Sequence, residues 1–443
     1  MQSITVDAAE PARAAVRHER LLVVAALLLF LCRAFVVGQL VPAWQGPDEP
    51  SHFALAKLVA MSAADSPAVR RAVERDVLAS MVRHRWWEPY GVPPPDPLPG
   101  SFEAVTGRLA TGTLLQPVYY VLAAAVLRAG SGGDVEQEYG LLRALSVALA
   151  AVSLIFGWAG TRLLFGPAVA LGTTIVGALH PQFVIMALYV NPDVLIAMMG
   201  AFVWWQAARL AMLPPSLVSI VLMLAVATLA VFTKRSAAPV LACAALMAGI
   251  GVFRLARGRR VPLVLVAVGM LVTLLWLYAR PRTALMTFWS YTLVDRRTGG
   301  DEVARALMTF VTMVDMSWLA PTYRYPAPEL WGWIARALTV VGVVGAAALA
   351  AVRRDMRRPF SVALLFAAAH VAAVFVIAFY GMNIPDGRFL FPARAAFAVV
   401  LWVGLSWMVP GPLRPWAGPM LVTLAAMLDV SGFAALVVPA YVR

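Results

Sequence analysis

The fold is decided by a stretch near the N-terminus: residues 21–41, LLVVAALLLFLCRAFVVGQLV, followed at 46–53 by GPDEPSHF. The first run is long enough to cross a bilayer, because about 20 apolar residues in a helix span the hydrocarbon core. The prolines that frame the second segment cannot continue a helix and favour extended backbone before them. The chain is therefore expected to turn at the membrane surface and to present Asp48, Glu49 and His52 there. These side chains suit a catalytic or metal-binding site, and they equally suit a polar cap that ends the helix.

Composition extends the membrane prediction to the whole chain. Of its 443 residues, 61% are hydrophobic and only 13% are charged, whereas soluble domains carry about 25% charged residues. The net charge of +13 does not indicate nucleic-acid binding, because most arginines lie in short loops that set topology and meet lipid phosphates. We expect an all-α polytopic membrane protein that contacts membrane lipids and no nucleic acid.

Polar segments divide the chain into a short tail and one membrane domain. Residues 1–20 are expected to form a cytoplasmic tail before a signal anchor that stays in the membrane, and residues 21–443 are expected to form a single compact bundle. Two long polar segments, 42–113 and 280–330, are predicted to lie on the outer face. Each carries an amphipathic pattern typical of an interfacial helix, at 67–87 and near 302–319 respectively.

Apolar runs predict about eleven transmembrane helices, with a range of 11–12. The full-length runs are 21–41, 141–163, 168–189, 194–212, 216–232, 237–253, 261–279, 331–352, 360–380, 390–409 and 416–438. Arginine clusters at 254–260 and 353–358 predict that these loops and the N-terminus are cytoplasmic. An even number of crossings must then separate the tail from the first cluster. The short run at 114–127 is therefore predicted to be re-entrant or interfacial.

This topology places four polar clusters on one, non-cytoplasmic face. They are Asp48, Glu49 and His52; Asn191 and Asp193; Lys234 and Arg235; and Asp386 and Arg388. Cations are disfavoured in short outer loops, so the third cluster indicates either snorkelling toward lipid phosphates or an anion site. A guanidinium binds phosphate with two parallel hydrogen bonds, and a carboxylate can deprotonate a hydroxyl. Together the clusters predict transfer from a lipid-linked phosphosugar, with the phosphate as the leaving group.

Other polar residues within the apolar runs favour structural roles. His180 before Pro181 predicts a kinked span with a hydrogen-bonded imidazole. His370 and Asp429 favour interhelical hydrogen bonds, although ionisable groups inside a membrane are also candidates for functional sites. Arg33 either reaches toward the outer face or snorkels to the lipid phosphates. The aromatic residues of the two outer segments are typical of an interfacial belt, with sugar stacking as the alternative.

Four short segments together resemble a known family. They are PDEPSHF at 47–53, NPD at 191–193, KRS at 234–236 and DGRFLFP at 386–392. In order and spacing they resemble the GT-C superfamily of polyprenyl-phosphate-dependent membrane glycosyltransferases, and more closely the DUF2142 family of bacterial membrane proteins. The resemblance implies a GT-C-like bundle with its active site on the outer face. It also implies that Asp48 or Glu49 supplies the catalytic carboxylate, that Asp193 is a second acidic position, and that Arg388 lies near the donor phosphate.

The sequence thus predicts a bacterial inner-membrane glycosyltransferase that moves a sugar from a polyprenyl-phosphate donor to a hydroxyl of a cell-envelope glycan or glycolipid. Asp48 is the predicted general base, and Glu49 assists it. The predicted substrate-binding residues are His52, Asn191, Asp193, Lys234, Arg235, Asp386 and Arg388. A divalent metal, Mg²⁺ or Mn²⁺, is left open, with Asp48, Glu49 and His52 as candidate ligands. The alternatives are a lipid-linked glycan flippase, which would need polar residues lining the spans at mid-membrane, and a non-catalytic scaffold, which would not need four converging clusters.

Overall fold

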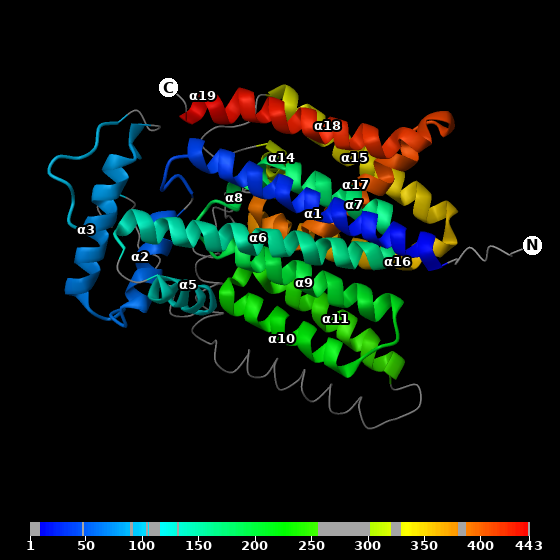
Figure 1. The fold of residues 1–443 in the computed structure, drawn as a ribbon, viewed down its shortest axis with the longest axis horizontal. Coiled ribbons are helices and arrows are strands. Elements are labelled where there is room, and N and C mark those ends of the chain that lie inside the picture. Colours follow the sequence, from blue (N-terminus) through cyan, green and yellow to red (C-terminus); the bar gives the residue numbers. More distant parts are fainter. Residues whose placement is uncertain are drawn as a thin grey trace, which may run out of the picture.

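A computed structural model describes residues 9–46, 48–88, 92–102, 105, 116–130, 133–255, 302–319, 329–379 and 387–441. Every regular element among these residues is helical, and most of the helices run side by side in one bundle (Figure 1). The predicted span at 261–279 and the site residue Asp386 lie outside the described residues.

The helices fall into a long bundle and a smaller group at one of its ends. The bundle contains α1 (Ala9–Leu40), α6 (Val135–Phe165), α7 (Pro167–Leu179), α8 (Pro181–Met186), α9 (Asp193–Met212), α10 (Leu217–Thr233), α11 (Ala238–Leu255), α15 (Glu329–Val352), α16 (Arg357–Phe379), α17 (Arg394–Met408), α18 (Ala417–Gly432) and α19 (Val438–Tyr441). The other α-helices are α2 (Glu49–Ala60), α3 (Pro67–Arg83), α5 (Val118–Ala129) and α14 (Glu302–Leu319). Short 3₁₀ turns at η3 (Arg235–Ala237), η5 (Arg354–Met356), η6 (Gly387–Ala393) and η7 (Gly411–Trp416) and a π-helical turn at η8 (Phe433–Val437) join or extend them.

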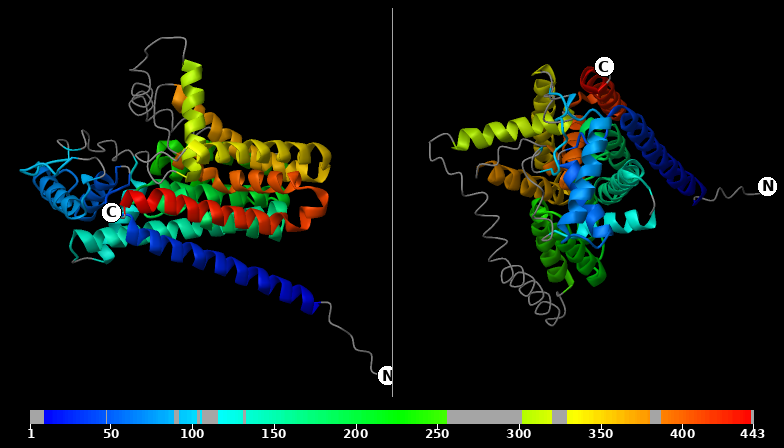
Figure 2. Two further views of the ribbon diagram at one scale, coloured as in Figure 1. Left: turned by 90° about the horizontal axis from the view of Figure 1, so that it is seen from above. Right: turned by 90° about the vertical axis from the view of Figure 1, so that its left-hand side faces the viewer.

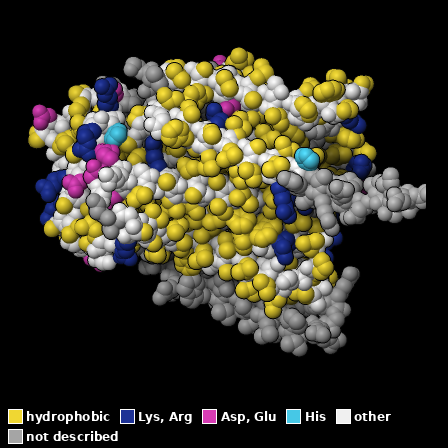
Figure 3. Space-filling model, in the orientation of Figure 1, with side chains coloured by type: hydrophobic (Ala, Val, Ile, Leu, Met, Phe, Trp, Pro, Cys, Tyr) yellow, Lys and Arg dark blue, Asp and Glu magenta, His cyan; other side chains and the backbone are white. Residues whose placement is uncertain are grey.

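Eight of the described helical segments are long and apolar enough to cross a membrane. Three further apolar helices, α5, α7 and α10, are shorter than these. In the view of Figure 3, hydrophobic side chains cover the middle of the bundle, and charged side chains gather mostly toward its ends. The prediction of a polytopic helical membrane protein is therefore confirmed, whereas the predicted count of eleven spans is not reached among the described residues.

The group formed by α2, α3 and α5 lies at the end of the bundle opposite the N-terminus (Figures 1 and 2). The predicted helix at 67–87 is present as α3, which begins after Ser66, whose hydroxyl accepts a hydrogen bond from the Val69 N–H. The run predicted at 114–127 is the 12-residue helix α5, which packs chiefly against α2. At 1.5 Å per residue it is about 18 Å long, too short for a core of about 30 Å. This geometry agrees with a segment that does not cross.

The predicted helix near 302–319 is α14, and it projects sideways from the bundle (Figure 2). Its outer part leaves Leu307 and Met308 exposed, whereas Met313 is buried against the bundle. The inner end meets η6, where the α-carbon of Gly387 lies so close to the Ser317 backbone that an added Cβ would overlap it. A glycine at this position is therefore what allows η6 to contact α14.

Four polar residues within the predicted spans acquire definite partners. Arg33 of α1 forms an ion pair with Asp429 of α18, so the interhelical bond predicted for Asp429 is present. The His370 imidazole instead bonds within its own helix, with Nδ1 at 2.8 Å from the Phe366 carbonyl, which corrects the interhelical prediction. His180 interrupts its apolar run between α7 and α8, and its Nδ1 accepts a hydrogen bond from the Phe183 N–H at 3.2 Å, as a hydrogen-bonded imidazole at a kink requires.

Candidate functional site

The core of the site is a buried carboxylate that faces two cations. Asp193 is only 2% exposed. Its Oδ1 lies 2.6 Å from Lys234 Nζ, and its Oδ2 lies 3.2 Å from Arg388 Nε. Asp193 therefore holds the two cations side by side, and paired cations of this kind are the groups that bind phosphate or carboxylate oxygens.

Helix ends bring these three residues together. Asp193 is the first residue of α9, Lys234 follows the last residue of α10, and Arg388 is the second residue of η6. Asn191 sets the turn before α9, because its Oδ1 accepts a hydrogen bond from the Asp193 N–H at 2.9 Å. Asn191 is fully buried, so it supports the site from inside the protein. The predicted meeting of the second, third and fourth clusters is thus observed for Asp193, Lys234 and Arg388.

His52 of α2 interacts electrostatically both with this cluster and with Asp48. Its Nδ1 shares a hydrogen bond of 2.7 Å with the Tyr120 hydroxyl of α5. Burial and the neighbouring Lys234 lower the pKa of His52 to about 4, an effect that Asp48 and Asp193 only partly offset. The imidazole is therefore neutral at physiological pH.

Asp48 occupies the open side of the site. Its side chain is exposed, and its backbone carbonyl accepts a hydrogen bond from the His52 N–H at 3.0 Å. Its φ of 57° lies in the left-handed region, which aspartate tolerates better than most residues. The Asp48 carboxylate is near enough to His52 and Tyr120 for its charge to raise the pKa of both groups. This carboxylate is thus accessible to a substrate hydroxyl.

Glu49 points the other way, into the protein. It is fully buried; Oε1 accepts hydrogen bonds from the Tyr139 hydroxyl and the Val190 N–H, each at 2.8 Å, and Oε2 accepts one from the Gly46 N–H at 2.9 Å. Burial raises the pKa of the Glu49 carboxyl, and Arg143 opposes that effect. Glu49 therefore fastens the acidic segment to α6 and to the turn before α9.

The supporting residues Tyr139, Arg143 and Tyr120 were not predicted from the sequence. Arg143 donates hydrogen bonds to the Gly38, Val41 and Pro42 carbonyls at 3.2–3.3 Å and so caps the C-terminal end of α1. Tyr139 and Arg143 are four residues apart on α6, a spacing that places both on one face of the helix. This spacing was the sequence feature that could have identified the two residues, but it does not tell which loop they contact.

The remaining predicted site residues are placed differently. Arg235 is half-buried in η3, and its side chain makes no hydrogen bond or ion pair with any residue that the structure describes. No group of three or more His, Cys, Asp or Glu suited to a metal ion occurs in the described part of the chain. Of Asp48, Glu49 and His52, which the sequence left open as candidate ligands, Glu49 has both of its carboxylate oxygens occupied by hydrogen bonds from donors inside the protein.

Comparisons with known proteins identify no relative of this chain. The chain matches no family model, no curated protein and no solved structure. The similarity to GT-C glycosyltransferases therefore stays a prediction, carried by the four sequence segments.

Proposed function

We propose that this protein is a membrane glycosyltransferase that uses a polyprenyl-phosphate-linked sugar as donor and a hydroxyl of a cell-envelope glycan or glycolipid as acceptor, on the outer face of the bacterial inner membrane. One observation carries the proposal: an exposed carboxylate, Asp48, and a cluster of one carboxylate and two cations, Asp193, Lys234 and Arg388, all act electrostatically on the same neutral imidazole, His52. Phosphosugar transfer needs these two parts side by side, a base for the acceptor and cations for the leaving phosphate.

In the proposed reaction, the Asp48 carboxylate takes the proton of the acceptor hydroxyl. The acceptor oxygen forms a bond to the anomeric carbon of the sugar, and the bond between that carbon and the phosphate oxygen breaks. The electron pair leaves on the phosphate, whose added negative charge is stabilised by Lys234 and Arg388. Asp193 holds both cations in position between turnovers, and Arg235, which makes no ion pair with a described residue, is a further cation for the phosphate.

The same contacts assign roles to the residues around the reacting groups. His52, held by Tyr120 at 2.7 Å, orients the acceptor hydroxyl toward Asp48. Glu49 keeps Asp48 at the site, because it accepts hydrogen bonds from the Gly46 N–H within the acidic segment and from the Val190 N–H before α9. The backbone turn at Asn191 fixes Asp193 in the same way.

Lipid analysis of a strain lacking the protein tests the proposal. We expect a polyprenyl-phosphate sugar to accumulate and an envelope glycan to lose one residue. Restoring wild-type protein should clear the lipid, and Asp48→Asn, which keeps the shape but removes the base, should not. Asp65→Asn, at an exposed carboxylate between α2 and α3, is the matched control and should behave as wild type. An unchanged lipid-linked sugar pool in the deletion strain, or full rescue by Asp48→Asn, would refute the assignment.

A further inference from the structure

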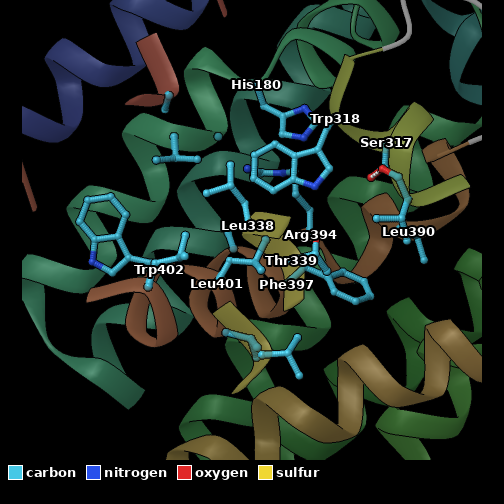
Figure 4. Close-up of a pocket in the computed structure, with 18 of the residues that line it drawn as sticks. His180, Ser317, Trp318, Leu338, Thr339, Leu390, Arg394, Phe397, Leu401 and Trp402 are labelled. Atoms are coloured by element: carbon cyan, nitrogen blue, oxygen red, sulfur yellow. Dashed lines mark hydrogen bonds between the residues drawn. The ribbon is translucent and has the colours of Figure 1, made fainter. Parts of the chain in front are cut away.

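A cavity of about 350 Å³ lies inside the bundle, separate from the residues of the proposed transfer site. It is lined by residues of α7, α14, α15, α16, α17 and α18 and by Leu390 and Phe391 of η6, the turn that also carries Arg388 (Figure 4). Its walls are almost entirely apolar, and Leu338, Leu401 and Trp402 are among them. The volume lies near the lower end of the range for small-molecule sites, about 300–1,000 Å³, which suits one apolar chain.

Arg394 is the one charged side chain among the residues that line this cavity. It is the first residue of α17, and Figure 4 shows it near His180 and Trp318. Its Cζ lies 4.3 Å from the centre of the Phe183 ring, but it makes no hydrogen bond or ion pair with any residue in the described ranges. A cation–π contact leaves the charge uncancelled, and an isolated charge in an apolar interior is strongly unfavourable.

The other polar lining groups do not supply a counter-charge. The Ser317 hydroxyl donates to the Val314 carbonyl at 2.8 Å, and the Thr339 hydroxyl donates to the Ala335 carbonyl at 2.8 Å. His180 uses Nδ1 to cap α8. The helix α7 even makes room for the guanidinium, since a Cβ at Gly177 would overlap Arg394 Nη1. The cavity is thus built to hold an uncompensated cation beside apolar walls.

We propose that this cavity binds a long-chain fatty acid, with its carboxylate on Arg394 and its alkyl chain along the apolar walls. A guanidinium matches a carboxylate in geometry and cancels its single charge. A phosphomonoester carries about −1.5 to −2 charges near neutral pH, which one arginine does not balance. The helix α18, which contributes Leu421, Leu424, Ala425 and Leu428, is the least buried of the eight candidate spans, so the cavity lies one helix away from lipid. This inference goes beyond the proposed transfer and does not depend on it.

Equilibrium binding of radiolabelled palmitate tests the inference. The full-length protein is placed in phosphatidylcholine nanodiscs, and binding to empty nanodiscs is subtracted. We expect saturable palmitate binding that hexadecanol, with the same chain and a neutral head, competes for at least about tenfold more weakly. Arg394→Gln should weaken palmitate binding by about tenfold or more, the factor expected for lost charge-assisted hydrogen bonds.

Arg414→Gln is the matched control, because Arg414 also stacks on an aromatic ring, with Cζ at 4.4 Å from the Trp407 ring centre, but is exposed. It should bind palmitate as wild type does. If Arg394→Gln does not fold, Ala425→Phe, which keeps the cation and fills the cavity, should abolish binding in its place. The inference would be overturned by any of four results: palmitate and hexadecanol bind equally, the Arg394→Gln and Arg414→Gln variants bind palmitate with equal affinity, hexadecyl phosphate binds more tightly than palmitate, or palmitate does not bind to the wild type.

Discussion

Replacing Asp193 by asparagine separates the electrostatic role of this residue from its shape. The change removes the charge that faces Lys234 and Arg388 but keeps the side-chain size. Side-chain exposure is 2% for Asp193, 9% for Arg388 and 23% for Lys234. Breaking a buried ion pair by removing one partner costs about 3–5 kcal/mol. We expect the lower part of that range, about 3 kcal/mol, because the partly exposed Lys234 can turn toward water whereas Arg388 cannot.

The assay is the free energy of unfolding in mixed detergent micelles titrated with SDS. Asp355→Asn is the control, because Asp355 pairs with Arg353 at a similar distance, 2.7 Å, but on the exposed surface. Surface pairs contribute little to stability, so the control should leave the free energy of unfolding unchanged within error. The double variant Asp193→Asn with Lys234→Met should regain part of the lost stability, because it removes one of the two cations that faced the lost carboxylate. An Asp193→Asn protein as stable as the control would refute the electrostatic account of the cluster.

The remaining predictions concern three other contacts of the site, each measured by the same unfolding assay. Folding lowers the pKa of His52 from 6.5 to about 4, so between pH 6.5 and pH 4 the unfolded chain binds a proton that the folded chain does not. The free energy of unfolding should therefore fall by up to about 3 kcal/mol as the pH drops through this range. His52→Gln should flatten that pH dependence. A pH profile of His52→Gln identical to wild type would contradict this. Glu49→Gln should cost about 1–3 kcal/mol, since an amide cannot accept from all three buried donors; no loss would show that these donors find other acceptors. Gly387→Ala should cost about 1–3 kcal/mol because its Cβ would overlap the Ser317 backbone, whereas Gly411→Ala, which meets open space, should not; equal effects would contradict the proposed close approach.

The sequence alone predicted most helix positions, because run length, prolines and charged ends are local signals. The expected helix near 302–319 is α14 with the same bounds, and the expected runs at 194–212 and 216–232 are α9 and α10 within one residue at each end. Two helices matched less simply, since the run at 168–189 is divided at His180 into α7 and α8. The count of spans is less local, because short helices such as α7 cross or stop according to their neighbours.

The sequence also determined that the polar clusters at the ends of α1, α8, α10 and α16 would lie near one another. Helices that alternate in direction bring every second connection to the same end of a bundle, and arginine spacing identified those connections. Counting the crossings tells at which end of the bundle a connection lies, but it does not tell in which direction a side chain of that connection points. The sequence therefore predicted that Asp48 and Glu49 face the same site, with Asp48 as the general base and Glu49 assisting it.

Only the tertiary structure separated them. Asp48 is exposed beside His52, whereas Glu49 is buried among the Gly46, Tyr139 and Val190 donors, because the turn at 46–49 packs against α6 and the segment before α9. The same holds for Arg33, whose partner Asp429 lies 396 positions away. Periodicity tells which residues face inward, but the contacts that each inward side chain makes depend on which helices pack beside it, and that is set by the whole bundle.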